Sequence, residues 1–333
     1  MRCDSWWAAA LVAACIVPAS LLAGTDPLLR VHQQRYSMGT MFDIVAYHTS
    51  QAAAEDAIGK ALDEIERLDR VLSHYRDDSD LARLIREGRQ QFVAVDASLY
   101  EVLRTAAEFS ERSGGRFDVT IGAVVKAWKG AQAEGRGPSA TDLAAAKRCV
   151  GYQQIETAPP DRVRLRSDCL DIDLGGIGKG YAVDRAMGIL RSASIRHAFV
   201  NAGSSSIAAV GHPPGQAGWT VRLGTGSQTI LLRDQSLSTS QQLLVPVGAG
   251  ATSFGEILDV RSGMPVGDGV VVTVVAPDAT TADALSTTLL MMSPDEGIEL
   301  LSQNPNVSAL WASRTGELMR EYRGSNVPLT GRR

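Results

Sequence analysis

The sequence predicts an α+β fold, and three observations support this prediction. The 333-residue chain has the composition of a globular protein, with 44% hydrophobic and 21% charged residues. Helix-like and strand-like patterns are mixed along it without the regular βαβ order of a parallel sheet. No internal repeat, low-complexity tract or clear linker divides the chain after an apolar leader, so we expect one large domain over 30–325.

The helices are predicted from apolar residues at helical spacing. In the segment 52–72 these residues include Ile58, Leu62, Ile65 and Leu68, which would form one buried face. Further helices are expected over 98–112, 141–147, 181–193, 281–292 and 294–301.

The strands are predicted from alternating or short apolar runs between turn residues. A first pair occupies 30–47 and is interrupted at 37–40. Exposed loops are expected at 211–217 and 248–252. The other strands are expected over 153–157, 162–166, 170–174, 197–201, 218–223, 228–232, 269–276, 307–312 and 318–322.

The amino terminus has the pattern of a secretory signal. Residues 6–23 are almost wholly apolar and follow Arg2, which predicts a signal peptide over 1–24 and an exported protein. An uncleaved membrane anchor is the alternative, although the run is at the lower limit of a spanning length. Residues 12–15 also resemble a lipoprotein box, which would place a lipid anchor on Cys15.

Two cysteines lie outside this leader, Cys149 and Cys169. The strands expected between them would turn near Pro159-Pro160, and the cysteines are equidistant from position 159, so they would face each other across a hairpin. A disulfide is therefore one prediction for an oxidising compartment. Two unpaired thiols are the other.

A glycine-rich turn joins an expected strand to an expected helix. The sequence DLGGIGKG at 173–180 places Lys179 among four glycines. Backbone N–H groups at such a turn, with a helix N-terminus and a lysine, form a site for phosphate. The segment is neither a Walker A loop nor a G-x-G-x-x-G motif. A tight turn that only packs the helix on the strand is the alternative.

A carboxylate and a hydroxyl share one face of the helix expected at 281–292. Asp283 and Thr287 are four residues apart, and such hard oxygen ligands suit Mg²⁺ when a substrate phosphate completes the shell. From spacing alone, Asp283 could equally be a helix cap or a surface charge. Asp259 could likewise simply pair with Arg261.

Several classes of function are not supported. The net charge of −4 and the sequence pI of about 5.8 argue against nucleic-acid binding. None of the five histidines lies at metal-ligand spacing from another, and HExxH is absent. The G-x-S-x-G motif of serine hydrolases is also absent.

Taken in chain order, the segments above resemble motifs of the ApbE family, the FAD:protein FMN transferases. DLGGIGKGYAVD at 173–184 is close to the family's D-L-G-G-I-A-K-G-Y-A-V-D, and ADALST at 282–287 is close to its A-D-A-L-A-T. Other family-like segments lie at 37–40, 72–81, 115–122, 150–152, 200–203, 238–240 and 258–265.

The resemblance implies an ApbE or T-fold-like α+β fold, with mixed sheets, flanking helices and an FAD cleft. It also implies a periplasmic protein, often a lipoprotein, which agrees with the leader. The family reaction is Mg²⁺-dependent and moves FMN from FAD onto a threonine of an exported acceptor flavoprotein, with release of AMP.

Carried over position by position, the resemblance also implies the residues of the site. FAD would contact Met38, Tyr75, Arg116, Phe117, Asp118, Asp173, Lys179 and Ile257. The metal would lie between the carbonyl of Gly176 and the side chains of Asp283 and Thr287, with Ser286 beside it. The candidate catalytic residues are Glu256 and Asp259.

The sequence departs from the family pattern at three places. Glu256 occupies the position of a family histidine taken as catalytic, Gln241 replaces the glycine of A-T-S-G, and Ser204 replaces the second glycine of N-x-G-G. Glu256 could accept a proton if burial raised its pKa. These departures leave two alternatives to the transferase: an FAD pyrophosphatase, and a non-catalytic periplasmic FAD-binding protein.

Overall fold

The computed structural model describes residues 27–89, 91–223, 228–247, 253–302 and 304–327. The expected signal peptide, with Cys15, and the expected loop at 248–252 lie outside these residues. In the part of the chain that is described, no helix is both long and apolar enough to span a membrane.

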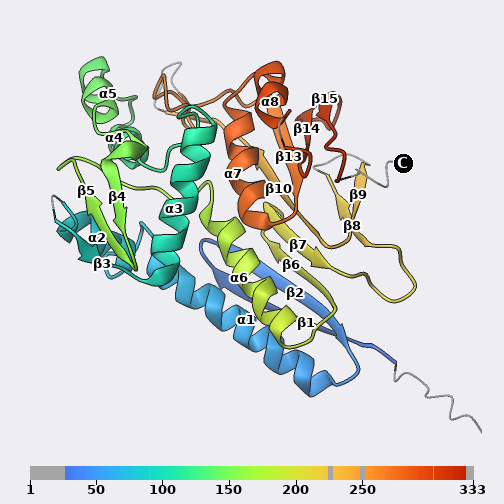
Figure 1. Ribbon diagram of the computed structural model, residues 1–333. Coiled ribbons are helices and arrows are strands. Elements are labelled where there is room, and N and C mark those ends of the chain that lie inside the picture. The colour runs from blue at the N-terminus through green and yellow to red at the C-terminus, as the bar shows by residue number, and fades with distance from the viewer. Residues whose placement is uncertain (1–26, 90, 224–227, 248–252, 303, 328–333) are drawn as a thin grey trace, which may run out of the picture.

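The centre of the molecule is an eight-stranded antiparallel sheet (Figure 1). The strand order is β1-β2-β6-β7-β10-β13-β14-β15. The strands are β1 (Leu29–Ser37), β2 (Thr40–His48), β6 (His197–Ala202), β7 (Ser206–Val210), β10 (Gln235–Gln241), β13 (Val270–Ala276), β14 (Ser308–Ser313) and β15 (Leu318–Tyr322). β1 and β2 join through Met38 and Gly39, both at positive φ (49° and 76°), a backbone typical of a tight hairpin.

Three helices cover one face of this sheet: α1 (Gln51–Leu72), α6 (Gly178–Ser192) and α7 (Ala279–Leu290) (Figure 1). α1 buries the predicted stripe of Ile58, Leu62, Ile65 and Leu68. α8 (Pro294–Leu301) follows α7 and begins with a capping box between Ser293 and Glu296.

The opposite face of the sheet carries a hairpin of β8 (Trp219–Arg222) and β9 (Thr229–Leu232). Trp219, Val221 and Ile230 from the hairpin form a second apolar cluster with sheet residues such as Ile207 and Leu237. A short antiparallel ribbon of β11 (Val245–Pro246) and β12 (Ser253–Phe254) follows β10 in the chain.

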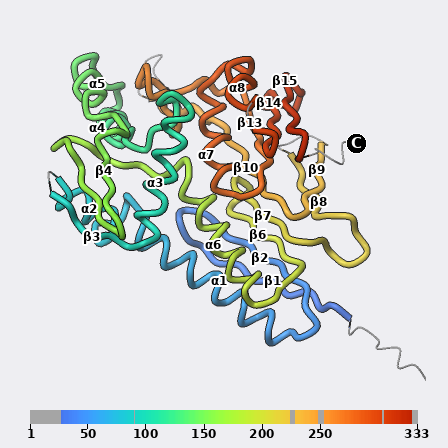
Figure 2. The backbone as a smooth tube through the Cα atoms, in the orientation of Figure 1, coloured from blue at the N-terminus to red at the C-terminus, as the bar shows by residue number. Residues whose placement is uncertain are grey.

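A smaller layer extends beyond one end of the central sheet, at the left in Figure 2. It contains the sheet β3-β5-β4, built from β3 (Val93–Ala94), β5 (Arg162–Leu165) and β4 (Ile155–Ala158), with a short 3₁₀ helix at Tyr152–Gln154 before β4. Its helices are α2 (Asp80–Glu87), α4 (Gly122–Ala133) and α5 (Ala140–Lys147), and α3 (Ala97–Arg112) lies beside them. α3 ends as expected before Gly114-Gly115, both at positive φ.

The α+β class and most of the predicted elements are confirmed, with three corrections. The expected strand at 170–174 is only an isolated bridge, Asp171 to Ile121. β7 and β10 were not predicted, because the short SIAAV run and the polar sequence QSLSTSQ lack an amphipathic strand pattern. The helices α2 and α4 and the two-residue strands β3, β11 and β12 were also missed.

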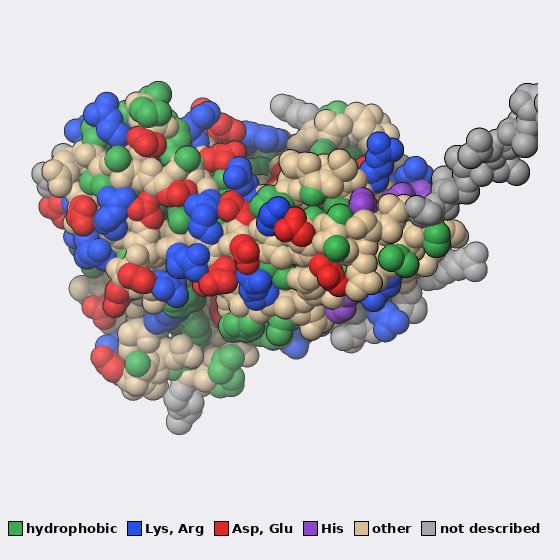
Figure 3. Space-filling model, turned by 90° about the horizontal axis from the view of Figure 1, so that it is seen from below, with side chains coloured by type: hydrophobic (Ala, Val, Ile, Leu, Met, Phe, Trp, Pro, Cys, Tyr) green, Lys and Arg blue, Asp and Glu red, His purple; other side chains and the backbone are tan. Residues whose placement is uncertain are grey.

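The surface over the α1 side mixes charges of both signs (Figure 3). On α1 itself, Lys60 pairs with Asp56 and Arg70 with Glu66, each four residues apart. Basic side chains on this face are therefore interspersed with acidic ones.

Candidate functional site

A cleft of about 1230 Å³ opens at the end of the central sheet. Its walls come from the β1–β2 turn, the loop after α1, the glycine-rich turn before α6, the ends of β6, β7 and β10, and α7. Eleven of the residues expected at the site line it: Met38, Tyr75, Phe117, Asp118, Asp173, Gly176, Lys179, Glu256, Ile257, Asp283 and Thr287. The segments that the sequence suggested separately are thus brought to one cavity.

The glycine-rich turn is held by its own first residue. Oδ1 of Asp173 accepts a hydrogen bond from the backbone N–H of Gly175 at 2.8 Å, and the Asp173 N–H donates to the carbonyl of Val119 at 2.7 Å. Nζ of Lys179 donates to the carbonyl of Gly175 at 3.4 Å. No side chain caps α6, so its amino-terminal end and the lysine together offer donors for an anion.

Asp283 on α7 is buried, with 4% of its surface exposed. Its Oδ2 accepts from the N–H of Gly180 at 2.8 Å, and its Oδ1 accepts from Oγ of Ser238 at 3.2 Å. Among the described residues, no cationic side chain lies within 4 Å of this carboxylate. A buried carboxylate without a cationic partner is unfavourable unless another positive charge offsets it.

Hydroxyl groups surround Asp283, and two of them were not among the predicted site residues. Ser240 on β10 lies 2.8 Å from Ser286 and 3.3 Å from Thr287, measured between hydroxyl oxygens. Ser238 and Ser240 are two residues apart and face α7 from one side of β10. The i, i+2 spacing of Ser238 and Ser240 could have identified them as neighbours on one strand face, but β10 was not predicted from the sequence.

Gly176 lies close to Thr287. A Cβ atom at position 176 would lie 3.1 Å from Cγ2 and 3.4 Å from Oγ1 of Thr287. A side chain there would therefore occupy the space in front of the Thr287 hydroxyl. The glycine leaves this space open beside the buried carboxylate.

α7 is anchored to α6 by the partly buried side chain of Asp184. Its carboxylate accepts from the N–H groups of Ala279 and Thr280, both at 2.8 Å, and from the Thr280 hydroxyl at 2.6 Å. Burial raises the pKa of Asp184 to about 6, although these hydrogen bonds oppose the shift. Asp184 thus fixes the start of the helix that carries Asp283.

Asp118 braces a loop of the cleft. Its Oδ1 accepts from the N–H and hydroxyl of Thr120, at 2.9 and 2.6 Å, and its Oδ2 accepts from the N–H of Tyr152 at 2.9 Å. Burial is the largest influence on this carboxyl and raises its pKa. Asp118 lines the cleft, but its carboxylate oxygens are engaged with the protein.

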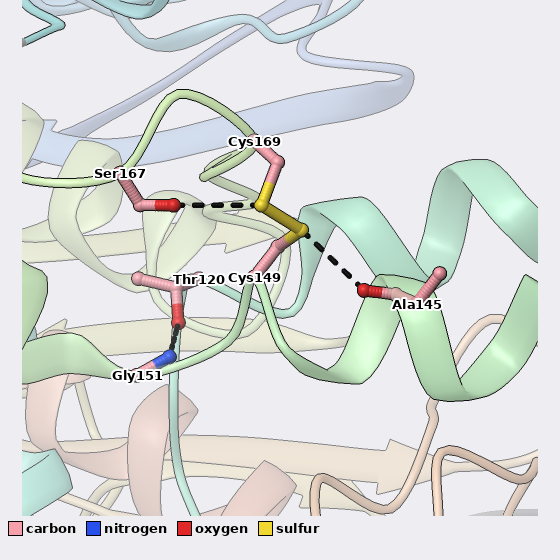
Figure 4. The surroundings of a disulfide bond; sticks show 6 residues. All are labelled: Thr120, Ala145, Cys149, Gly151, Ser167 and Cys169. Carbon is pink, nitrogen blue, oxygen red and sulfur yellow. Dashed lines mark hydrogen bonds between the residues drawn. A yellow bond between two sulfur atoms is a disulfide. The ribbon is translucent and has the colours of Figure 1, made fainter.

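The disulfide between Cys149 and Cys169 is formed (Figure 4). Of the two alternatives that the sequence left open, the structure therefore supports the bridge across the Pro159-Pro160 hairpin. Gly151, next to Cys149, donates through its N–H to Oγ1 of Thr120 at 2.7 Å. The bridge thus joins the segment held by Asp118 to the segment that enters the glycine-rich turn.

Three predicted site residues do not line the cleft. Arg116 donates to the carbonyl of Met291 at 3.1 Å and to Glu296 at 2.7 Å, and it lies 3.7 Å from Asp259. Asp259 pairs with Arg116, whereas the sequence suggested Arg261, and its Oδ1 closes a turn by accepting from the N–H of Ser262. Ser286 is fully buried, and its hydroxyl donates to the backbone carbonyl of Asp283 at 3.1 Å. In this structure the three residues brace the cleft.

Glu256 lies on the rim of the cleft and is exposed. The burial that the sequence analysis required for Glu256 is therefore not present. The adjacent Ile257 is held through its backbone by the buried Gln242, whose Nε2 donates to the Ile257 carbonyl at 2.8 Å and whose Oε1 accepts from the Ile257 N–H at 3.2 Å. Gln242 was also not predicted, since a single glutamine carries no pattern.

His74 was likewise not predicted to belong to the site, although it lines the cleft. Its Nε2 is buried, lies 3.7 Å from Oδ2 of Asp173 and makes no hydrogen bond with the described chain. Burial lowers the pKa of His74, while the Asp173 carboxylate opposes this shift. Burial thus favours the neutral form of its imidazole.

The fold and the cleft define an α+β domain built around one large ligand-binding site. The sequence profile of the ApbE family matches residues 38–311, and the chain belongs to this family. The FAD:protein FMN transferase of Treponema pallidum is 30% identical over 300 residues, which cover 82% of each chain.

Two solved structures share the fold. The ApbE protein of Thermotoga maritima has 27% identity and a TM-score of 0.75, and the match covers 88% of this chain and 97% of that protein. The flavin transferase ApbE of Vibrio cholerae has 24% identity and a TM-score of 0.77, over 90% and 98% of the two chains. The family and fold expected from the sequence are confirmed.

Proposed function

We propose that the protein is an FAD:protein FMN transferase. FAD is its substrate, and a flavoprotein is the acceptor. The reaction breaks the P–O–P bond of FAD and forms a bond from the FMN phosphorus to a threonine oxygen of the acceptor. The threonine hydroxyl loses its proton, and AMP is the leaving group.

The observation that supports this proposal is the set of groups that line the cleft, in a chain that belongs to the ApbE family. One cavity contains a glycine-rich turn with Lys179 for a diphosphate, an exposed aromatic ring at Tyr75, and the buried carboxylate of Asp283. The name shared by relatives over most of the chain is FAD:protein FMN transferase. A diphosphate joined to a flat ring system matches this set of groups.

The residues around Asp283 fit a Mg²⁺ ion. The carboxylate has no cationic partner among the described residues, hydroxyl groups lie around it, and Gly176 keeps the adjacent space open. The described chain brings no three His, Cys, Asp or Glu side chains together at a metal site. In this proposal the ion would be held by Asp283, Thr287 and the Gly176 carbonyl, with Ser286 beside them. Phosphate oxygens of the substrate would complete the shell.

Each part of the chain has a defined task in this proposal. Lys179 and the N-terminal end of α6 bind and orient the diphosphate. Asp173 keeps the turn in shape through its bond to Gly175. When bound, Mg²⁺ would supply positive charge for the anion that develops during the transfer. In this proposal Glu256, on the rim of the cleft, would accept the proton of the incoming threonine hydroxyl.

The test is incubation of the mature protein with FAD, Mg²⁺ and an acceptor flavoprotein. We expect covalent flavin fluorescence in the acceptor band on a denaturing gel, together with an equal amount of AMP by chromatography. AMP without labelled acceptor would indicate the pyrophosphatase instead. FAD binding without either product would indicate a binding protein, and a gain of transfer in Glu256→His would then identify a diverged member.

We also propose that the protein works in the periplasm. The apolar leader over 1–24 supports export, and Cys15 is the candidate for a lipid anchor. The test is mass spectrometry of the protein purified from membranes and from the periplasmic fraction. A diacylated Cys15 at the mature amino terminus is expected for the anchored form, and an unprocessed leader would contradict cleavage.

A further inference from the structure

Tyr75 is unusually exposed for an aromatic residue in a ligand cleft, with 75% of its surface accessible. It lies in the loop between α1 and α2. Its N–H donates to Oγ of Ser73 at 3.3 Å, and Oγ of Ser79 donates to the Ser73 carbonyl at 2.6 Å. These bonds order the backbone of the loop, but they do not hold the Tyr75 ring.

The ring contacts the neighbouring His74 ring, with centroids 3.7 Å apart, and its hydroxyl end is held by a residue from a different element. Nζ of Lys129, on α4, lies 4.5 Å from the centroid of the Tyr75 ring and donates a hydrogen bond to Oη at 3.1 Å. Both side chains line the cleft. A cation beside an aromatic face is attractive, and the added hydrogen bond selects one orientation of the ring.

Lys129 extends from a rigid position. Its neighbour Trp128 is buried, with 1% exposure, and its indole N–H donates to the carbonyl of Gly263 at 2.8 Å. Trp128 also packs near Phe254, with ring centroids 6.1 Å apart. The lysine therefore joins a surface loop to a part of α4 that is fixed on two sides.

We propose that Lys129 is a positioning residue for the flat aromatic end of the substrate. It holds the Tyr75 ring in one orientation in the cleft, so the ring meets the isoalloxazine already ordered. Without Lys129, binding must also order the exposed ring, which lowers affinity. The identity of this aromatic end as a flavin rests on the proposed function.

Lys129 and Lys179 then serve different parts of the same ligand. Lys179 belongs to the glycine-rich turn and acts on the diphosphate, whereas Lys129 acts on the ring system through Tyr75. A ligand that has the diphosphate but lacks the flavin should be insensitive to Lys129. This difference separates positioning of the ring from a general loss of positive charge.

The experiment compares the affinities of FAD and ADP by calorimetry, using the mature chain. In Lys129→Met we expect the FAD dissociation constant to rise roughly tenfold, the size of a partly desolvated cation–π contact, and the ADP constant to stay unchanged. Lys129→Arg should restore most of the FAD affinity, because a guanidinium also binds an aromatic face. In a Tyr75→Ala background, Lys129→Met should cause no further loss.

The matched control is Lys60→Met, which removes an exposed lysine paired with Asp56 on α1, and should bind FAD as the unmutated chain does. Equal FAD affinity of Lys129→Met and the unmutated chain would overturn this inference but leave the proposed function standing. So would an equal loss for FAD and ADP, or an additive loss in the Tyr75→Ala background. Failure of the unmutated chain to bind FAD would instead refute the proposed function and this inference together.

Discussion

The N–H of Gly180 donates a 2.8 Å hydrogen bond to Oδ2 of Asp283, which joins the start of α6 to α7 across 103 positions of sequence. The two helices meet backbone to backbone at this point. A Cβ at position 180 would lie 2.3 Å from the carbonyl oxygen of Ala279 and 2.7 Å from Cβ of Asp283. Because the first of these atoms belongs to backbone, no side-chain rearrangement can make room.

Gly180→Ala should therefore push the start of α6, with the glycine-rich turn, away from α7, which carries Asp283. We expect the free energy of unfolding to fall by about 3 kcal/mol, as for overpacking against backbone, and FAD affinity to fall with it. The measurements are urea denaturation and calorimetry. Gly188→Ala, in the same helix with no atom within 4 Å of its Cβ, is the control and should gain up to about 1 kcal/mol. Equal stabilities of the two variants would rule out the close contact.

Asp283→Asn tests the metal site. The amide oxygen can still accept from the Gly180 N–H, so the fold should survive, but the negative charge is lost. We expect transfer activity at fixed Mg²⁺ to fall at least roughly 100-fold, and the Mg²⁺ concentration for half-maximal activity to rise. Activity assays over a Mg²⁺ titration measure both.

The control for this variant is Asp295→Asn. Asp295 is a highly exposed carboxylate that pairs with Arg320 on the surface, so its loss should leave the Mg²⁺ titration unchanged. If Asp283→Asn retained the Mg²⁺ dependence of the unmutated protein, the buried carboxylate would not be a metal ligand.

Reduction of the Cys149–Cys169 disulfide should loosen the cleft as well as the fold. The bridge closes a loop with a sequence separation of 20, for which the loss on reduction is about 3 kcal/mol. Since the bridge joins the segments braced by Asp118 and Asp173, we also expect weaker FAD binding. Denaturation with and without reductant, after a mass check for the two added hydrogens, measures the effect. Reductant should not affect the double variant Cys149→Ser/Cys169→Ser.

The parts of the fold that the sequence predicted are those where side-chain pattern and environment agree. α1 has an apolar stripe that is buried, and α8 has its capping residues in the expected order. β10 was missed because one of its buried faces consists of serines, of which Ser238 and Ser240 contact polar side chains of α7. A polar strand buried at a functional site cannot be recognised by hydrophobic alternation.

The candidate site was predictable where a motif carries its own chemistry. The glycine-rich turn with Lys179 and the Asp283–Thr287 pair are local patterns, and the structure places both at the cleft. The contacts of Lys129 with Tyr75 and of His74 with Asp173 join elements that approach each other only in the fold. Arg116 and Asp259 show the converse case, because a charged residue in a motif can brace the site from behind.

Asp184 should make stability depend on pH. Its pKa is raised to about 6 in the folded protein, above the ordinary value of 3.8, so the folded state binds the proton more tightly than the unfolded state. The associated stabilisation is therefore complete below about pH 4 and is lost as the pH rises through about 6. A difference of about two pKa units corresponds to about 3 kcal/mol.

The measurement is the free energy of unfolding from pH 4 to 7.5, compared with Asp184→Asn, which does not titrate. The unmutated protein should gain stability relative to the variant as the pH falls. A difference between the two proteins that stays constant over this range would contradict the shifted pKa.

Ser204 stands where the family motif has glycine, and the structure gives a physical reason for the family's choice. In the turn between β6 and β7, Ser204 has a φ of 63°, and its N–H donates to Oδ1 of Asn201 at 2.8 Å. A side chain in this left-handed region costs about 1 kcal/mol, whereas glycine adopts it freely. Ser204→Gly should therefore raise the free energy of unfolding by about 0.5 kcal/mol, after the greater freedom of glycine in the unfolded chain is counted.

The matched control is Ser205→Gly. Ser205 has no positive φ, and its hydroxyl donates to the carbonyl of Ala202 at 3.2 Å. The substitution therefore removes this hydrogen bond and increases the conformational freedom of the unfolded backbone. It should lower the free energy of unfolding by about 1 kcal/mol. Denaturation of both variants decides the matter: a loss of stability in Ser204→Gly would mean that the serine is not strained in this turn.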